Sequence, residues 1–212
     1  MPAESTKVLV FDLLSYWHIG TGRGANAQAD AIVARDPAGL PYLPGRTVRG
    51  LLRSAFALAV AAGRLPVARE KELFGSRPAG AGKSDGDEAE LALEEGRFGT
   101  EPGRLWFGSA VLPAAWRSWA GSLPAGDPAR APLDELFTYV ASTAIGADGV
   151  AKPHTLRVRE VAVPLTLRAE VRGPADDPRW AAELQDVLGL VRGLGSRRQR
   201  GYGRVRVHLE EA

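Results

Sequence analysis

Residues 41–61, PYLPGRTVRGLLRSAFALAVA, contain the clearest structural pattern in this 212-residue chain. Pro44 and Gly45 break the preceding segment, and apolar residues then recur at three- and four-residue spacing, which predicts an amphipathic helix. Its apolar stripe consists of Val48, Leu51, Leu52, Ala55, Phe56 and Ala59. Another side carries three arginines, Arg46, Arg49 and Arg53. The stretch therefore predicts a helix with one side in the core and one basic side.

The segments before this helix differ sharply in composition. Lys7 to Trp17 is rich in Val, Leu, Phe, Tyr and Trp and lacks Gly and Pro, which predicts a buried strand. His18 to Pro44 is rich in Gly, Ala, Asn, Asp and Pro, which predicts a long loop containing Asp30 and Asp36. Either aspartate can brace the loop or face a reacting phosphate, and the residues alone do not choose between these roles.

An acidic, Gly-rich insertion is expected after the helix, at about 64–103. Within it, Gly80 to Ser84 ends like a phosphate-binding P-loop, but Arg77 stands where the first glycine is required, and acidic residues follow from Asp85. These acids would oppose a triphosphate, so the sequence does not favour a nucleotide hydrolase.

The remaining elements follow from periodicity and from turn residues. We expect a strand at 104–112, a turn or short helix at 113–119, a helical or mixed stretch at 133–145 and a strand at 158–171. A second amphipathic helix is expected from Trp180 to Val191, ended by Gly193 and Gly195, and a last strand from Arg204 to Leu209. In that strand Arg204, Arg206 and His208 alternate with apolar residues, which predicts a basic sheet face.

The order strand, helix, strands, helix, strand predicts an α+β fold of the ferredoxin-like, or RRM-like, type. We expect a single domain over residues 1–212, with insertions at about 64–103 and 120–160. The second insertion is expected to contain a projecting hairpin.

Composition excludes several classes of protein. The chain has no cysteine, and its histidines are His18, His154 and His208, which are too scattered for a zinc cluster. No stretch approaches the ~20 apolar residues that span a bilayer, so we expect a cytoplasmic protein with no membrane partner.

The net charge is only +2, but the charges are unevenly distributed. No acidic residue lies between Asp36 and Glu70, or between Asp186 and Glu210, and both intervals contain several arginines. The chain therefore has two separate basic segments, whose positive charge is offset in the net charge by the acidic insertion.

The C-terminal run GSRRQRGYGR, residues 195–204, combines glycines, arginines and one tyrosine. Glycines let backbone N–H groups approach phosphates, guanidinium groups bind phosphate bidentately, and an aromatic ring can stack on a base. A flexible turn with solvated arginines is the alternative. Because the first helix is also basic, we expect RNA to be held between that helix and this loop. The residues expected to bind RNA are His18, Arg46, Arg49, Arg53, Gly195, Arg197, Arg198, Arg200, Gly201 and Gly203.

Residues 41–53 resemble the Pro-x-Ile-Pro-Gly-Ser-Ser-x-Lys-Gly-x-x-Arg signature of the CRISPR repeat-associated (RAMP) superfamily. Three further stretches agree in order, which are HIGTG at 18–22, LFGS at 73–76 and the Gly-Arg-Gly-x-Gly loop near the C-terminus, so that the resemblance spans almost the whole chain. The sequence departs from the pattern at Arg46, where a small residue is usual, and at Arg197 and Arg198, which occupy places that are often glycine.

Asp30, which stands six residues before Asp36, is similar in position to the target-cleaving aspartate of type III backbone subunits. The resemblance implies a palm with an inserted thumb hairpin that binds guide RNA and target RNA, other CRISPR effector subunits and copies of itself along the guide. It also implies a metal-dependent endoribonuclease, in which Asp30 is the catalytic residue and a ligand of a weakly held divalent cation, Mg²⁺ or another, shared with RNA phosphates.

Two alternatives remain at this point. The chain can be a purely structural RNA-binding subunit in which Asp30 only shapes its loop. It can instead be a guide-processing endoribonuclease that uses His18 as general base, because imidazole titrates near neutrality.

Overall fold

The computed structural model describes residues 3–20, 31–76, 101–124 and 126–212. Asp30 lies outside the described residues, as does the segment 77–100 with its acidic cluster. The described chain combines helices with antiparallel strands, so the predicted α+β class is confirmed.

A four-stranded sheet forms the centre of the structure, in the order β2-β5-β1-β6 with antiparallel pairing throughout. The strands are β1 (Glu4–Leu13), β2 (Trp106–Phe107), β5 (Thr166–Pro174) and β6 (Val205–Glu211). Leu9 and Phe11 of β1 point to the same face as Leu167 and Val171 of β5, and all four are fully buried. This face of the sheet is one wall of the hydrophobic core.

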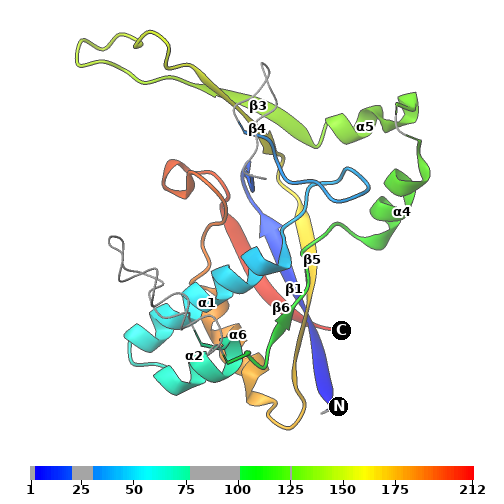
Figure 1. The fold of residues 1–212 in the computed structure, drawn as a ribbon, viewed down its shortest axis with the longest axis vertical. Coiled ribbons are helices and arrows are strands. Elements are labelled where there is room, and N and C mark those ends of the chain that lie inside the picture. Colours follow the sequence, from blue (N-terminus) through cyan, green and yellow to red (C-terminus); the bar gives the residue numbers. More distant parts are fainter. Residues whose placement is uncertain (1–2, 21–30, 77–100, 125) are drawn as a thin grey trace, which may run out of the picture.

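Helices α1 (Gly45–Ala61) and α6 (Arg179–Leu188) cover that apolar face (Figure 1). The stripe predicted for the first helix is buried at Val48, Leu52, Ala55, Phe56 and Ala59. In α6, Trp180 and Leu184 are fully buried, and the indole nitrogen of Trp180 donates to the Ser5 hydroxyl of β1. Both predicted amphipathic helices are therefore observed, and each packs as its periodicity requires. However, α6 ends at Leu188, before the predicted Val191, and Gly189 rather than Gly193 or Gly195 follows its last residue.

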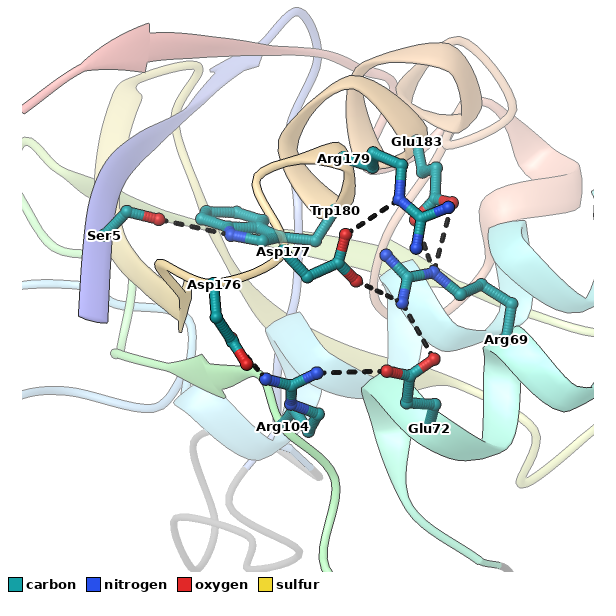
Figure 2. Close-up of polar contacts among 9 residues, drawn as sticks. All are labelled: Ser5, Arg69, Glu72, Arg104, Asp176, Asp177, Arg179, Trp180 and Glu183. Carbon is teal, nitrogen blue, oxygen red and sulfur yellow. Dashed lines mark hydrogen bonds and ion pairs between the residues drawn. The ribbon is translucent and has the colours of Figure 1, made fainter. Parts of the chain in front are cut away.

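A short helix that the sequence did not predict, α2 (Val67–Phe74), is fastened to α6 by a cluster of charges (Figure 2). Arg69 is 6% exposed, and its guanidinium pairs with Glu72 at 2.8 Å, with Asp177 at 2.6 Å and with Glu183 at 2.8 Å. Burial by itself would lower the pKa of Arg69, but the three carboxylates raise it overall. The guanidinium therefore stays charged, and α2 is held against the loop before α6.

A two-stranded hairpin, β3 (Phe137–Ser142) with β4 (Arg157–Ala162), projects from the sheet (Figure 1). We call this hairpin the thumb. The elements that lead into it are α4 (Ala114–Ser122), the 3₁₀ turn η1 (Pro128–Arg130) and α5 (Ala131–Asp134). A second 3₁₀ turn, η2 (Arg198–Arg200), lies between α6 and β6. No helix of the described residues is long and apolar enough to cross a membrane.

Several predicted elements differ from the observed ones. The first strand ends at Leu13, and Trp17 only bridges Ala162 of the thumb. The strand expected at 104–112 shrinks to two residues, although Ala110 and Val111 each make an isolated bridge.

The other differences lie around the thumb. Only the first two residues of the stretch 133–145 are helical, because residues 137–142 pair with β4 as β3. The strand expected at 158–171 is split into β4 and β5 around Pro164, which cannot donate to a ladder.

The outer face of the sheet corrects another expectation. Arg206 and His208 do face away from the core, but so do Asp12, Glu170 and Glu210 on the neighbouring positions of the sheet. Ion pairs neutralise most of these charges, with Arg168 on Glu210 at 2.6 Å and Arg172 on Glu170 at 2.8 Å. The prediction of a basic sheet face is wrong, because it considered one strand without its partners.

Candidate nucleic-acid interface

A groove with a volume of about 740 Å³ lies between α1 and the segment that follows α6. On the α1 side its lining combines the small residues Gly50, Ser54 and Ala55 with Thr47, Leu51 and Leu58. On the other side it is lined by Arg192, Gly193, Gly195, Arg198 and Gln199. The predicted meeting of the first helix with the C-terminal loop is therefore observed, and two guanidinium groups face it.

The loop at 193–204 is fixed by backbone hydrogen bonds to the end of β1 and the residues after it. The amide of Ser196 donates to the His18 carbonyl at 3.1 Å, and the amide of Gly203 donates to the Tyr16 carbonyl at 2.8 Å. The amide of Leu194 closes the loop on the Gly203 carbonyl at 2.9 Å. The backbone on both sides of the loop arginines is thus held in place by these hydrogen bonds.

Two glycines of this loop are required for reasons of packing. Gly195 and Gly203 have φ angles of +74° and +64°, and a Cβ atom on either would collide with a backbone carbonyl, of His18 and of Leu194 respectively. At Gly201, with φ +84°, a Cβ atom would meet no heavy atom within 4 Å. The stretch Arg-Gly-Tyr-Gly at 200–203 therefore reflects loop geometry at its last glycine and conformational freedom at the one before it.

Arg197 has a left-handed backbone, with φ +59°. This conformation is costly for a residue with a Cβ atom, which explains why glycine suits this place. Its guanidinium donates to the Ser142 hydroxyl of β3 at 3.1 Å, and Arg159 of β4 donates to the Ser196 hydroxyl at 2.7 Å. These two contacts connect the loop to one face of the thumb.

The three arginines of α1 do not face the groove. Arg46 and Arg49 line a separate hollow of about 360 Å³ together with Gly103 and Trp106. Arg49 donates to the Phe74 carbonyl at 2.5 Å.

Arg53 donates to the Gly75 carbonyl at 2.8 Å and pairs with Glu70 at 3.0 Å. The expectation that the basic side of the helix meets the C-terminal loop is wrong, because that side lies towards α2. RNA contact by these arginines stays a prediction.

His18 is buried, with 4% of its surface exposed. Its Nδ1 donates to the Glu160 carbonyl at 2.7 Å, so the proton is on Nδ1. Burial lowers the pKa of His18 below its ordinary value, and the hydrogen bond to Glu160 offsets this only in part. The ring is therefore neutral at pH 7 and enclosed. Both roles considered for it, RNA contact and general base, stay predictions.

Glu160 holds the segment that follows Asp30. Its carboxylate is buried and accepts from the Val33 amide at 2.8 Å and from the Arg35 guanidinium at 2.6 Å. Its own amide donates to the Ala31 carbonyl at 3.0 Å. The chain is thus fastened to the thumb from the residue immediately after Asp30.

Asp36 is used in its own turn, where Oδ1 accepts the amides of Ala38 and Leu40 at 2.9 and 3.0 Å. The bracing role considered for it from the sequence is therefore observed. The described residues contain no cluster of three or more His, Cys, Asp or Glu side chains suited to a metal ion.

The sequence did not single out three residues that shape this region. Arg192 was visible only as part of a basic segment, and Arg159 and Glu160 sit in a strand whose neighbours depend on tertiary pairing. Because adjacent residues of a strand point to opposite faces, the sequence could have indicated that Arg159 and Glu160 contact different parts of the chain.

Comparisons with known proteins agree with the fold. A family model described as RAMPs, the RAMP superfamily, matches residues 10–206. A solved chain from a structure described as "Cryo-EM structure of the Type III-B Cmr-beta bound to cognate target RNA" is 11% identical, with a TM-score of 0.64 over 96% of both chains. A second, from "Type III-B Cmr-beta Cryo-EM structure of the Apo state", is 12% identical, with a TM-score of 0.61 over 97% of both chains. A search of curated protein sequences finds no match.

Proposed function

Because this chain belongs to the RAMP superfamily, we propose that it is an RNA-binding backbone subunit of a cytoplasmic type III CRISPR effector complex. Its partners are guide RNA, target RNA, other effector subunits and copies of itself. The observation that carries the proposal is the groove between α1 and the C-terminal loop, with Arg192 and Arg198 in its wall. The likeness to a chain from a complex bound to cognate target RNA supports the choice of ligand.

The sheet order also supports a finer description of the fold. Strands β1, β2, β5 and β6 alternate with α1 and α6 as in a βαββαβ unit, and their order β2-β5-β1-β6 is that of a ferredoxin-like sheet. In this description the sheet with its two helices is the palm, and the hairpin β3–β4 is the thumb inserted between β2 and β5.

The groove suits a sugar-phosphate backbone more than a base. Its helix wall includes Gly50 and Ser54, whose small side chains allow close approach, and its loop wall supplies guanidinium groups, which bind phosphate bidentately. Contacts of this kind position a strand without reading its sequence. We therefore expect the chain to bind single-stranded RNA with little sequence preference.

Salt dependence tests the groove. Replacing Arg198 with alanine should lower the log–log salt slope of single-stranded RNA binding by about 0.7, the value for one phosphate contact. Arg206→Ala is the matched control, because Arg206 is exposed on the outer face of the sheet. Equal effects of the two substitutions would show that binding is non-specific attraction, and the groove would lose its assigned role.

We extend the proposal to cleavage of the target at Asp30. In this reaction the 2′-hydroxyl of the target attacks the adjacent phosphorus, and the carboxylate of Asp30 takes the hydroxyl proton. The bond from phosphorus to O5′ breaks, and O5′ takes a proton from water. The products are a 2′,3′-cyclic phosphate and a 5′-hydroxyl. The fastening of Ala31 and Val33 to Glu160 supports a fixed start for the segment that follows Asp30.

Mg²⁺ belongs to this proposal as an ion held by Asp30 and by RNA phosphates. We assign no step of the reaction to the metal. Asp30→Ala in a reconstituted complex should abolish target cleavage while RNA binding is kept. Unchanged cleavage would leave the chain a structural subunit. Metal-free cleavage of repeat RNA by the lone chain, lost in His18→Ala, would favour the guide-processing alternative.

A further inference from the structure

A second basic hollow lies on the far side of the segment that follows Asp30. Residues 18–20 pair with residues 33–34, through the bridge between Gly20 and Val33 and the 2.8 Å hydrogen bond from the Ala34 amide to the Ile19 carbonyl. Ile19 lines the groove described above, whereas Arg35 lines a different hollow of about 550 Å³. This paired segment therefore separates two cavities. We call the one containing Arg35 the second hollow.

The charges of the second hollow favour an anion. Arg35 and Arg117 contribute guanidinium groups, and Tyr42 and Ser109 contribute hydroxyl groups. Among the described residues that line it, the single carboxylate, that of Asp36, is directed to backbone amides of its own turn. Of the two guanidinium groups, that of Arg35 is already paired with the Glu160 carboxylate, so Arg117 supplies the positive charge that is left for a ligand.

The two arginine side chains of the second hollow differ in how firmly they are held. Arg35 is fixed, because it pairs with Glu160 and stacks on the Phe137 ring at 3.9 Å. Arg117, on α4, is exposed, and its guanidinium makes no ion pair or hydrogen bond with the other described residues. One guanidinium therefore marks a fixed position and the other remains available to a ligand.

The two faces of the thumb contact different parts of the chain. Side chains alternate along its strands, so that Ser142 and Arg159 face the C-terminal loop, whereas Phe137 and Glu160 face Arg35. A strand lying in the groove would pass one face of the thumb, and a strand lying in the second hollow would pass the other.

We propose that the second hollow binds the sugar-phosphate backbone of the RNA strand that pairs with the guide, through Arg35 and Arg117. This inference rests on the proposed function, because it assumes that the groove holds the guide. Guanidinium and hydroxyl groups around one open hollow suit phosphodiester oxygens. Arg35 follows Asp30 by five residues, so this assignment brings the strand to be cut to the segment that carries the cutting residue.

Binding of one RNA with and without its complement tests this assignment. The affinity of the full chain is measured over a range of salt concentrations for a single-stranded RNA and for the same RNA annealed to its complement. Arg117→Ala should leave the single-strand salt slope unchanged and lower the duplex slope by about 1, the loss of one phosphate contact. Arg64→Ala is the control, because Arg64 is also exposed but lies just past the end of α1.

Each outcome has a distinct meaning. An equal loss for both RNAs in Arg117→Ala would place the hollow on the path of the guide and overturn the inference. Unchanged slopes for both RNAs in Arg117→Ala would also overturn it. If Arg117→Ala instead caused another effector subunit to dissociate from the assembled complex, the hollow would be a binding site for an acidic protein surface, and the inference would again be overturned. If the wild-type chain binds neither RNA, the proposed function itself fails, which is a different result from failure at Arg117 alone.

Discussion

Replacement of Arg69 by methionine tests whether the charge cluster in Figure 2 fastens α2 to the rest of the chain. Methionine keeps the apolar stem and removes the charge, so Glu72, Asp177 and Glu183 would face one another without their shared partner. Removing one partner of a buried ion pair costs about 3–5 kcal/mol. The side chains of Glu183 and Glu72 are 20% and 41% exposed, and water screens the second. We therefore expect about 3 kcal/mol, at the lower end of the range.

Urea unfolding at pH 7, followed by tryptophan fluorescence, measures this loss. With a slope of about 2 kcal/mol per molar urea, the midpoint should fall by about 1.5 M without a change in slope. In a thermal scan the same loss corresponds to a fall of about 6–12 °C in Tm. Arg179→Met is the control, because Arg179 is 76% exposed and its ion pair within the described chain is with Asp177, so its effect should be much smaller.

Acid should remove the difference between the Arg69 variant and the wild type. Hydrogen bonds from Arg179 and Arg69 lower the pKa of Asp177 to about 2, and those from Arg69 and Arg104 lower the pKa of Glu72 below its ordinary value. A carboxylate with a lowered pKa stabilises the folded state above its unfolded-state pKa, and this contribution is lost as the pH falls towards the folded-state value. The gap should therefore narrow between pH 4.5 and about 2. A midpoint equal to wild type at pH 7, or a gap that does not depend on pH, would refute the reasoning.

Three further predictions concern the loop, His18 and Glu160. Gly203→Ala should destabilise the fold and weaken RNA binding, because a Cβ atom would collide with the Leu194 carbonyl, whereas Gly201→Ala should cost only about 1 kcal/mol for its left-handed backbone; urea unfolding and RNA titration of both variants check this. Since burial lowers the pKa of His18, the wild type should lose stability as the pH falls below 6.5, and His18→Gln should lack this component; a parallel pH dependence of the two would contradict the buried neutral ring. Glu160→Gln should weaken the hold on Val33 and Arg35, so hydrogen exchange at residues 31–35 should become faster while exchange in α6 is unchanged.

The helices and the outline of the fold could be predicted from the sequence because their signals are local. The apolar stripes of α1 and α6 lie in consecutive residues, although the predicted end of α6 at Val191 lies three residues beyond the observed one. Helix α2 was missed because its eight residues depend on Arg69, whose partners Asp177 and Glu183 lie more than 100 residues away. The thumb was only partly predicted, since β3 is a strand through its pairing with β4.

The candidate site divides in the same way. The loop arginines and the first helix could be identified from their charge and glycine spacing, and the structure brings that helix and that loop together. The side of the helix that faces the loop could not be predicted, because it depends on α2, whose carbonyl groups accept from Arg49 and Arg53. The enclosure of His18 under Glu160 likewise depends on a strand 142 residues away.

The charges on the outer face of the sheet are mostly paired, whereas the arginines of the groove are not, so the two surfaces differ in electrostatic potential. Arg168, Arg172 and His208 have acidic neighbours there, whereas Arg192 and Arg198, which line the groove, make no ion pair within the described chain. A polyanion that approaches by diffusion is therefore attracted to one side. A protein with a small net charge can in this way orient its groove towards RNA before contact. We therefore expect the rate of association with RNA to fall as salt is added, although the paired charges on the outer face of the sheet contribute little to this effect.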